Sequence, residues 1–374
     1  MPPRTHHVTV DPWKPLAEQP EIGHNRWHEA IPPILEVEEG DRVILDTLDA
    51  LDGQITPGMT AQEVAGADLG PVHALTGPVF IKGAEAGDLL EVKLIDIEAD
   101  PWGHYGFTAQ LPGFGFLRDS FPDPHIVHWR IVDDYAESDE LPGIRLRYGA
   151  HPGCIGLAPS KELRERILER EGAALEAGGM VLMPDAAGAV PGGDIGGEAL
   201  RTVPPREVAG NIDIKQITPG TSVYLPVYAE GALFSTGDVH FAQGDCEACG
   251  TGIEMRSRVH VEFKIHKGLA EERGIRSLQF ARDTYFNVPE LAAPRRFYAT
   301  TGFSVTEEGE NRAEDLTLAA RNALLSMIDH LGTRGYDRQQ AYAICSVAVD
   351  LRVSQVVDAP NFIVSALLPL DIFM

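Results

Sequence analysis

Residues 259–266, with the sequence VHVEFKIH, alternate strictly between apolar and polar side chains. Successive side chains of a strand point to opposite faces of a sheet, so this period of two predicts a half-buried strand. The residues expected to face inward are Val259, Val261, Phe263 and Ile265. The stretch therefore predicts a sheet with one face on a core and the other toward solvent.

Several other β-rich runs open directly after a turn that contains glycine. They are residues 42–48 after Gly40-Asp41, residues 89–97 after Gly87-Asp88, and residues 222–228 after Gly220-Thr221. The 374 residues include 38 glycines and 27 prolines, a composition that favours many short strands joined by turns over long helices. We expect residues 1–150 and about 200–270 to form mostly antiparallel sheet.

Helical signals are few and lie mostly near the end of the chain. Ser160 is a good N-cap for a short helix, and an apolar stripe predicts a longer helix over about 313–331 that ends at Gly332. Asp337 precedes Gln340 by three residues, the spacing of a capping box at the start of another helix. Two strand-like runs follow it, at 347–357 and 362–368.

These patterns predict a mainly β fold with a smaller C-terminal α+β part. The length exceeds what one hydrophobic core usually reaches, so we expect more than one structural unit. The predicted parts are a β-rich part at 1–150, a second β-rich part at 151–275 that carries the site strands, and the α+β part at 276–374. Residues 171–199 are rich in glycine, alanine and glutamate, which predicts a mobile loop or a plain surface insertion.

The net charge of −25 excludes broad classes of partner. Nucleic-acid binding depends on Lys and Arg that neutralise phosphates, and anionic membrane surfaces also attract basic segments, so neither partner is expected. The N-terminal residues lack the apolar core of a signal peptide, and no apolar run reaches the ~18 residues of a membrane span. With only four scattered cysteines, we expect a cytoplasmic protein with reduced thiols.

Two short stretches concentrate polar groups that carry chemistry. If residues 211–215 form a strand, Asn211, Asp213 and Lys215 share one face; the alternative is a solvated strand face with a surface ion pair. Residues 237–247 hold carboxylates and an imidazole suited to a divalent ion such as Zn²⁺ or Ca²⁺, or they form a polar turn. The ligand-capable side chains there are Asp238, His240, Asp245 and Glu247.

The cysteines offer weaker signals. Cys246 and Cys249 have the spacing of half a zinc ribbon, but the chain has no second pair, so two reduced cysteines are expected. Cys154 follows His151 by three residues, which suggests either a nucleophile or, more commonly, a small buried residue beside glycines.

Taken together, ordered segments over about residues 20–370 resemble the acetamidase/formamidase family. The densest segments are Gly210-Asn211-Ile212-Asp213-Ile214-Lys215, Gly237-Asp238-Val239-His240 and Gln243-Gly244-Asp245-Cys246-Glu247, with further ones at 24–28, 48–55, 75–79, 82–90, 151–153 and 201–207. The resemblance implies a β-sandwich-like body, a homo-oligomer, and hydrolysis of a short aliphatic amide to a carboxylate and ammonia. The family usually has glycine where this chain has Cys246, which reshapes the expected pocket.

The resemblance also suggests roles for single residues. A divalent ion on Asp213, Asp238 and His240 would activate water, Lys215 would stabilise the oxyanion, and Glu247 would relay a proton. The substrate would contact residues from four segments, and these are His24, His151, Asn211 and Gln243. One alternative uses Cys154 as nucleophile with Lys215 and Glu247. Another is a non-catalytic small-amide or small-ligand binding protein, because fold does not fix function.

Overall fold

The strand expected at residues 259–266 lies inside a six-stranded sheet in the computed structural model, which describes residues 3–284 and 296–374. It forms β18 (Ser257–His266), and Val259, Val261 and Phe263 are buried as predicted, while Ile265 is half-buried. The sheet order is β1 (Thr5–Val8), β5 (Arg42–Thr47), β18, β7 (Leu89–Ala99), β15 (Ser222–Pro226) and β19 (Gln279–Ala281).

Turns that contain glycine open three of these strands, as the sequence predicts. Gly40, Gly87 and Gly220 have φ angles of 85°, 94° and 95°, a left-handed conformation that favours glycine because it has no Cβ. The strands β5, β7 and β15 begin within two residues of these turns. β7 and β15 pair in antiparallel register although about 130 residues separate them, so parts of the chain before and after residue 150 share one sheet.

A larger sheet of eleven strands carries the site. Its main order is β11 (Arg145–Arg147), β10 (Tyr135–Glu137), β9 (His125–Val132), β8 (Tyr105–Gln110), β17 (Glu254–Met255), β16 (Phe234–His240), β12 (His151–Gly156) and β14 (Ala209–Asn211). β6 (Leu75–Ile81) also pairs with β16, and β2 (Gly23–His24) and β4 (Leu35–Val37) pair with β6. A separate two-stranded pair joins β3 (Arg26–Trp27) to β13 (Leu200–Arg201).

Apolar side chains from both large sheets form one core. Phe234 of β16 and Phe263 of β18 meet edge to face, with ring centroids 5.1 Å apart. Val79 and Val92 belong to the same buried cluster, and so does Met327 from the C-terminal part. The core therefore connects the two sheets and extends to the C-terminal helices.

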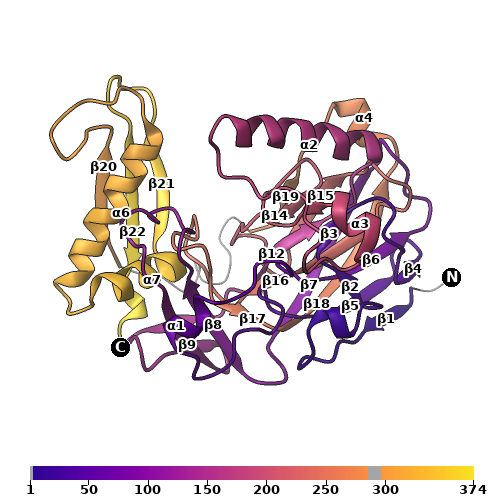
Figure 1. Ribbon diagram of the computed structural model, residues 1–374, viewed down its shortest axis with the longest axis horizontal. Coiled ribbons are helices and arrows are strands. Elements are labelled where there is room, and N and C mark those ends of the chain that lie inside the picture. The colour runs from indigo at the N-terminus through magenta and orange to yellow at the C-terminus, as the bar shows by residue number, and fades with distance from the viewer. Residues whose placement is uncertain (1–2, 285–295) are drawn as a thin grey trace.

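The C-terminal part is a three-stranded sheet covered by two helices, which Figure 1 shows at one side of the β body. The strand order is β20 (Phe297–Phe303), β22 (Ile363–Pro369) and β21 (Asp350–Gln355), and the helices are α6 (Leu316–Gly332) and α7 (Arg338–Ala348). Asp337 and Gln340 form the predicted capping box, with reciprocal bonds of 2.8 and 3.0 Å. The mainly β fold class with a smaller helical part is confirmed.

Residues 171–199 are more ordered than predicted. Ser160 caps α2 (Lys161–Glu176), which is longer than the short helix expected from the sequence, and α3 (Gly193–Glu198) lies further on. The segment between them is held by the buried Arg26, whose guanidinium donates to the carbonyl oxygens of Asp185 and Ala187 at 2.9 and 3.1 Å. These backbone contacts are long-range, so the composition of the segment did not reveal them.

The remaining helices are short: α1 (Ala61–Val64), α4 (Leu269–Arg273) and the 3₁₀ turns Leu16–Glu18 and Leu370–Ile372. Within residues 3–284 and 296–374, no helix combines the length and the apolar character needed to cross a bilayer.

We predict that Gly302→Ala destabilises the C-terminal part. A Cβ at Gly302 of β20 would collide with the α6 backbone at the Ala319 carbonyl oxygen and the Ala323 nitrogen, so the helix would have to move away from the sheet. Overpacking of this kind costs about 1–3 kcal/mol, measured as a lower melting temperature. Gly197→Ala is the control, since a Cβ there meets nothing within 4 Å. Equal melting temperatures for the two variants would contradict the prediction.

Candidate active site

Three neighbouring strands of the eleven-stranded sheet bring the polar groups together. His240, the last residue of β16, lies opposite His151 of β12 on one side and opposite Glu254 of β17 on the other. Cys154 of β12 lies opposite Gly237, next to Asp238. The antiparallel register therefore places groups from three distant segments around the end of one strand.

The imidazole of His240 is oriented by the side-chain amide of Gln243. Gln243 Nε2 donates to the Asp213 carbonyl oxygen at 2.8 Å, so its Oε1 faces the ring and accepts from His240 Nδ1 at 2.7 Å. The same Oε1 lies 3.1 Å from His151 Nε2, and the two histidine rings meet edge to face. Because Nδ1 carries the donated proton, the lone pair or second proton of His240 is at Nε2.

Three carboxylates surround His240 Nε2. Asp238 Oδ1 lies at 3.3 Å, Glu254 Oε1 at 3.2 Å and Glu247 Oε1 at 3.8 Å. His240, Asp238 and Glu254 are buried, with side chains no more than 3% exposed. Asp213 belongs to the same cluster, because one of its oxygens lies within 4.8 Å of ligand atoms of His240 and Glu247.

Burial and mutual charge raise the pKa values of three of the carboxyl groups and of the imidazole in this cluster. Burial, and then the Asp238 charge, raises the pKa of Asp213 to about 7, and burial raises the pKa of Glu254 to about 8. Burial and the Asp213 charge raise the pKa of Glu247 well above its usual range. Burial alone would lower the pKa of His240, but Glu254 and Asp238 raise it well above its ordinary value. The cluster therefore favours a positive charge at its centre.

The backbone around the cluster is irregular, and this corrects one prediction. Residues 211–215 are not an alternating strand: β14 ends at Asn211, and Asp213 has a φ of 46°. The amides of Ile212 and Asp213 both donate to the Gly153 carbonyl oxygen, at 2.8 and 3.3 Å, so the chain turns instead of extending. The alternating pattern of the sequence does not predict this turn, because the turn depends on Gly153, sixty positions away.

Glycine is needed where the carboxylates meet the neighbouring strand. A Cβ at Gly153 would lie 2.6 Å from Asp238 Oδ2 and 2.8 Å from Asp213 Oδ1. A side chain would therefore push both carboxylates out of the cluster. Asp238 itself has a φ of 53°, which interrupts the regular pleat of β16 at this point.

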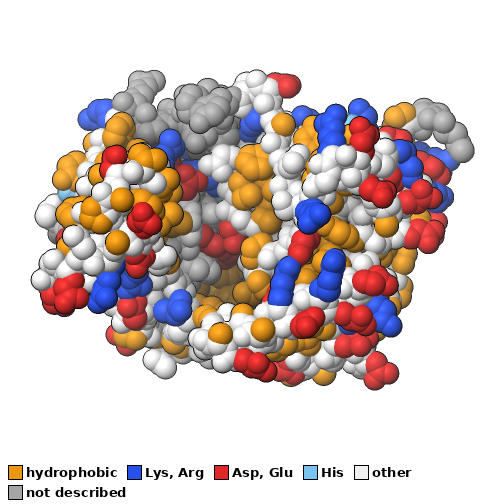
Figure 2. Space-filling view, turned by 90° about the horizontal axis from the view of Figure 1, so that it is seen from above, with side chains coloured by type: hydrophobic (Ala, Val, Ile, Leu, Met, Phe, Trp, Pro, Cys, Tyr) orange, Lys and Arg blue, Asp and Glu red, His pale blue; other side chains and the backbone are white. Residues whose placement is uncertain are grey.

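A cavity of about 110 Å³ opens beside the carboxylates. An enclosed apolar cavity of ~150 Å³ accepts benzene, so this volume suits a small molecule. Both polar and apolar side chains line it, and the lining includes Asn211, Asp213, Asp238, Glu247, Glu254, His73, Ala50, Leu51, Leu69, Val72, Ala109, Leu111, Phe114, Leu182 and Val203. Figure 2 shows a hollow between the C-terminal part and the β body, with acidic and hydrophobic side chains in it.

Most residues expected at the site lie in or directly behind the cavity. Asn211, Asp213, Asp238 and Glu247 line it, and Asn211 is held by a bond of 3.0 Å from its Nδ2 to the Val203 carbonyl oxygen. The other three, His151, His240 and Gln243, form the hydrogen-bonded group behind the carboxylates.

Three expected residues lie elsewhere. His24 is buried against Trp27 with its Nε2 2.7 Å from Ser235 Oγ, and burial lowers its pKa to about 4. Lys215 forms an ion pair with Asp350, and Asp245 accepts from Gln216 Nε2 at 3.0 Å. None of the three lines the cavity.

The cysteine nucleophile finds no support in this geometry. The Cys154 thiol is fully buried and lies 3.4 Å from both Asn211 Oδ1 and Asp238 Oδ2. Burial, and then the Asp238 charge, raises the pKa of the thiol well above its usual value, whereas a reactive cysteine needs a lowered pKa. Cys246 is exposed and Cys249 is buried, and both are free thiols.

Sequence reasoning missed two members of the cluster, Glu254 and His73. Glu254 stands between Ile253 and Met255, and an acidic residue between two apolar neighbours is a weak signal of a buried carboxylate. His73 lies in the loop before β6, with Nε2 3.9 Å from Asp238 Oδ2, and nothing in its local sequence points to this contact.

The donor set fits a divalent ion. Two groups of three ligand atoms meet at His240, one with Asp238 and Glu254 and one with Asp213 and Glu247. Imidazole nitrogen and carboxylate oxygen are ordinary ligands of zinc. An isolated cluster of buried carboxylates is costly unless a cation compensates it.

Known proteins are similar to this chain over nearly its whole length. The family model described as the acetamidase/formamidase family matches residues 9–374. A formamidase from Methylophilus methylotrophus is 36% identical over 96% of this chain and 91% of its own length. An acetamidase from Mycolicibacterium smegmatis is 36% identical over 90% of this chain and 88% of its own length. The solved structure of a gamma lactamase from Delftia acidovorans has a TM-score of 0.93 and 36% identity over 99% of this chain and 93% of its own. The chain belongs to the acetamidase/formamidase family, and it is an amidase.

Proposed function

We propose that the protein hydrolyses a short aliphatic amide in the cavity beside His240, with the help of a divalent metal ion. The observation that carries the proposal is the ring of carboxylates around His240 Nε2. Asp213, Asp238 and His240 would hold the ion, as the sequence suggested, and Glu254 would be a further ligand. The family supports an enzyme over the non-catalytic binding protein that the sequence left open.

Zn²⁺ suits this donor set better than Ca²⁺. Ca²⁺ takes oxygen ligands only, whereas the centre of the cluster is an imidazole nitrogen. The Gln243 amide orients that imidazole by accepting from its Nδ1, which is the usual way in which a metal-binding histidine is fixed. A divalent ion bound there would supply Lewis acidity, which polarises a carbonyl group and acidifies water.

The chain's own side chains would position the amide and move its proton. The apolar side chains that line the cavity, among them Leu111 and Val203, would hold the acyl group. Glu247 lines the cavity and lies 3.8 Å from His240 Nε2, and its carboxylate would carry a proton from water to the amide nitrogen. Ammonia leaves readily only after that nitrogen is protonated. Lys215 does not line the cavity, so we assign it no contact with the oxyanion.

A γ-lactam is a second candidate substrate. The specific observation is the 0.93 TM-score to a structure named as a gamma lactamase, at 36% identity. A γ-lactam is a cyclic amide of compact shape, and its hydrolysis breaks the same type of C–N bond. It releases no ammonia, because the amine stays attached to the product.

Assembly into a homo-oligomer and a cytoplasmic location remain proposals. The first is supported by the resemblance to the family. The second is supported by the four free cysteines, which suit a reducing compartment.

Removal of metal is expected to abolish ammonia release, because the carboxylate cluster would then lack its cation. Activity and bound metal should fall together on dialysis against a chelator, and both should return when Zn²⁺ is added. Chelator already saturated with Zn²⁺ is the control and should have no effect. Full activity in protein that elemental analysis shows to be free of metal would refute the metal mechanism.

His240→Ala is expected to lower kcat/KM by more than ~10²-fold, because it removes both the ligand and the centre of the cluster. Ammonia release, bound metal and melting temperature should be measured on the same sample. His260→Ala is the matched control, since His260 of β18 pairs with Glu98 of β7 and neither residue lines the cavity. Near-normal turnover with metal retained in His240→Ala would place the site elsewhere.

The small cavity predicts that rates fall as the acyl group grows. Formamide and acetamide should be hydrolysed at least ~10-fold faster than benzamide, because a pocket discriminates by the space it offers. Leu111→Ala enlarges the cavity and should reduce the ratio of the formamide rate to the benzamide rate. Leu175→Ala changes an exposed side chain and should leave that ratio unchanged. Equal rates for formamide and benzamide in the wild type would show that this cavity does not bind the acyl group.

A further inference from the structure

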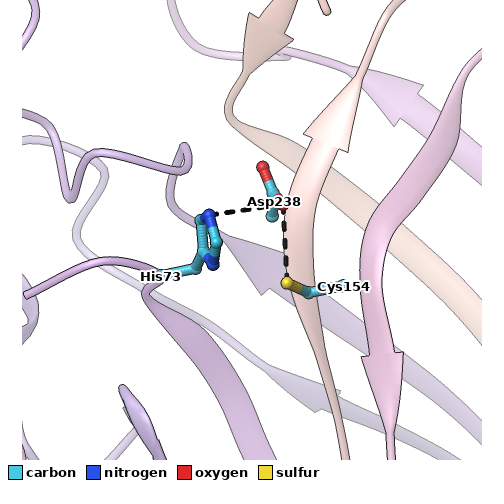
Figure 3. A group of neighbouring side chains, drawn as sticks. All are labelled: His73, Cys154 and Asp238. Carbon is cyan, nitrogen blue, oxygen red and sulfur yellow. Dashed lines mark hydrogen bonds and ion pairs between the residues drawn. The ribbon is translucent and has the colours of Figure 1, made fainter. Parts of the chain in front are cut away.

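A second group of metal-ligating side chains lies on the other side of Asp238. Figure 3 shows His73, Cys154 and Asp238 pointing toward one another, with Cys154 and Asp238 on adjacent strands and His73 on a loop. One ligand atom from each residue lies within 4.8 Å of the other two. The amide mechanism above uses Asp238 from this group and leaves His73 and Cys154 without a role.

The two oxygens of Asp238 face different partners. Oδ1 lies 3.3 Å from His240 Nε2, in the cluster already described. Oδ2 lies 3.4 Å from Cys154 Sγ and 3.9 Å from His73 Nε2. One carboxylate therefore separates two sets of donors and contacts both.

The spacing in the second group leaves room for an ion. A distance of 3.9 Å between His73 Nε2 and Asp238 Oδ2 is too long for a hydrogen bond. Ligands about 2.0–2.3 Å from a tetrahedral zinc ion stand about 3.3–3.8 Å from one another. The sulfur–oxygen distance of 3.4 Å already matches this, and the nitrogen–oxygen distance needs only a small closure.

The surroundings of the group favour metal binding over a purely structural contact. His73 Nδ1 lies 3.2 Å from Thr202 Oγ1, which orients the ring so that Nε2 points toward Asp238. His73 and Asp238 line the cavity, so an ion could enter from there and keep one position open to a ligand. Cys154 is fully buried behind them and is shielded from oxidants in solvent.

We propose that His73, Cys154 and Asp238 form a second divalent-metal site that contains a thiolate and shares Asp238 with the His240 cluster. Sulfur, imidazole and carboxylate together favour Zn²⁺ among the common divalent ions. On binding, the Cys154 S–H bond breaks, a metal–sulfur bond forms, and the proton leaves to solvent. The site stands on its own donors, so it does not depend on the proposed amide hydrolysis.

The test uses Co²⁺ as a spectroscopic substitute for Zn²⁺. Full-length protein freed of metal is titrated with Co²⁺ without oxygen, and sulfur-to-cobalt charge-transfer absorption is followed in the near ultraviolet. The expected result is a band in the wild type that disappears in Cys154→Ser. Cys246→Ser is the matched control and should keep the band, since that thiol is exposed and outside the group. X-ray absorption on the Zn²⁺ form should show a sulfur ligand at ~2.3 Å.

A second variant guards against a folding defect in Cys154→Ser. His73→Ala removes a ligand that is 12% exposed and should weaken Co²⁺ binding at this site by more than ~100-fold while the thiol remains. Absence of the band in the wild type at saturating Co²⁺, or its persistence in Cys154→Ser, would overturn the proposal. Wild-type protein that shows the band but releases no ammonia from any small amide would count against the amidase mechanism and leave this site standing.

Discussion

Asp213, Asp238, Glu247 and Glu254 crowd around a single imidazole nitrogen beside a small cavity. Carboxylates in such a place repel one another and lose hydration, at a cost of several kcal/mol for each charge that stays unpaired. The raised pKa of Asp213, Glu247 and Glu254 and the raised pKa of His240 express this one constraint. The site therefore favours positive charge, and a bound cation would resolve the conflict.

The sheet tolerates this crowding because its register is fixed far from the site. The shared core, including the contact of Phe234 with Phe263, holds β16 in place, and β12 and β17 pair on either side of it. Local departures then aim the side chains, through the left-handed backbone at Asp238 and the missing side chain at Gly153. A rigid framework with a few irregular residues gives more exact placement than a mobile loop would.

Cys154 illustrates how position changes the meaning of a residue. Beside a histidine in the sequence, it suggested a nucleophile. In the structure it is a buried thiol next to the Asp238 carboxylate, and both features disfavour the free thiolate. The same neighbours suit a metal ligand, because a bound cation would compensate the charge on the sulfur. Two adjacent donor groups share Asp238, which fits the high density of carboxylates in this part of the protein.

The sequence by itself determined the mainly β class, the glycine turns before β5, β7 and β15, and the two C-terminal helices. Each depends on local periodicity or capping, which the chain encodes within a few residues. It also predicted that Asp238, His240 and Glu247 lie near one another, as they do in the structure, because they are close together along the chain. The family, first seen as a resemblance, was confirmed by comparison over residues 9–374.

Only the tertiary structure decided which of the remaining polar residues meet. It brought in Glu254 and His73, placed Lys215 with Asp350, and placed His24 in the core beside Trp27. The contacts of His73 with Asp238 and of Lys215 with Asp350 join segments up to about 170 residues apart, and no local pattern reports them. Strand register and a turn fixed by the Gly153 carbonyl oxygen set them, since pairing between distant strands determines which side chains share a space.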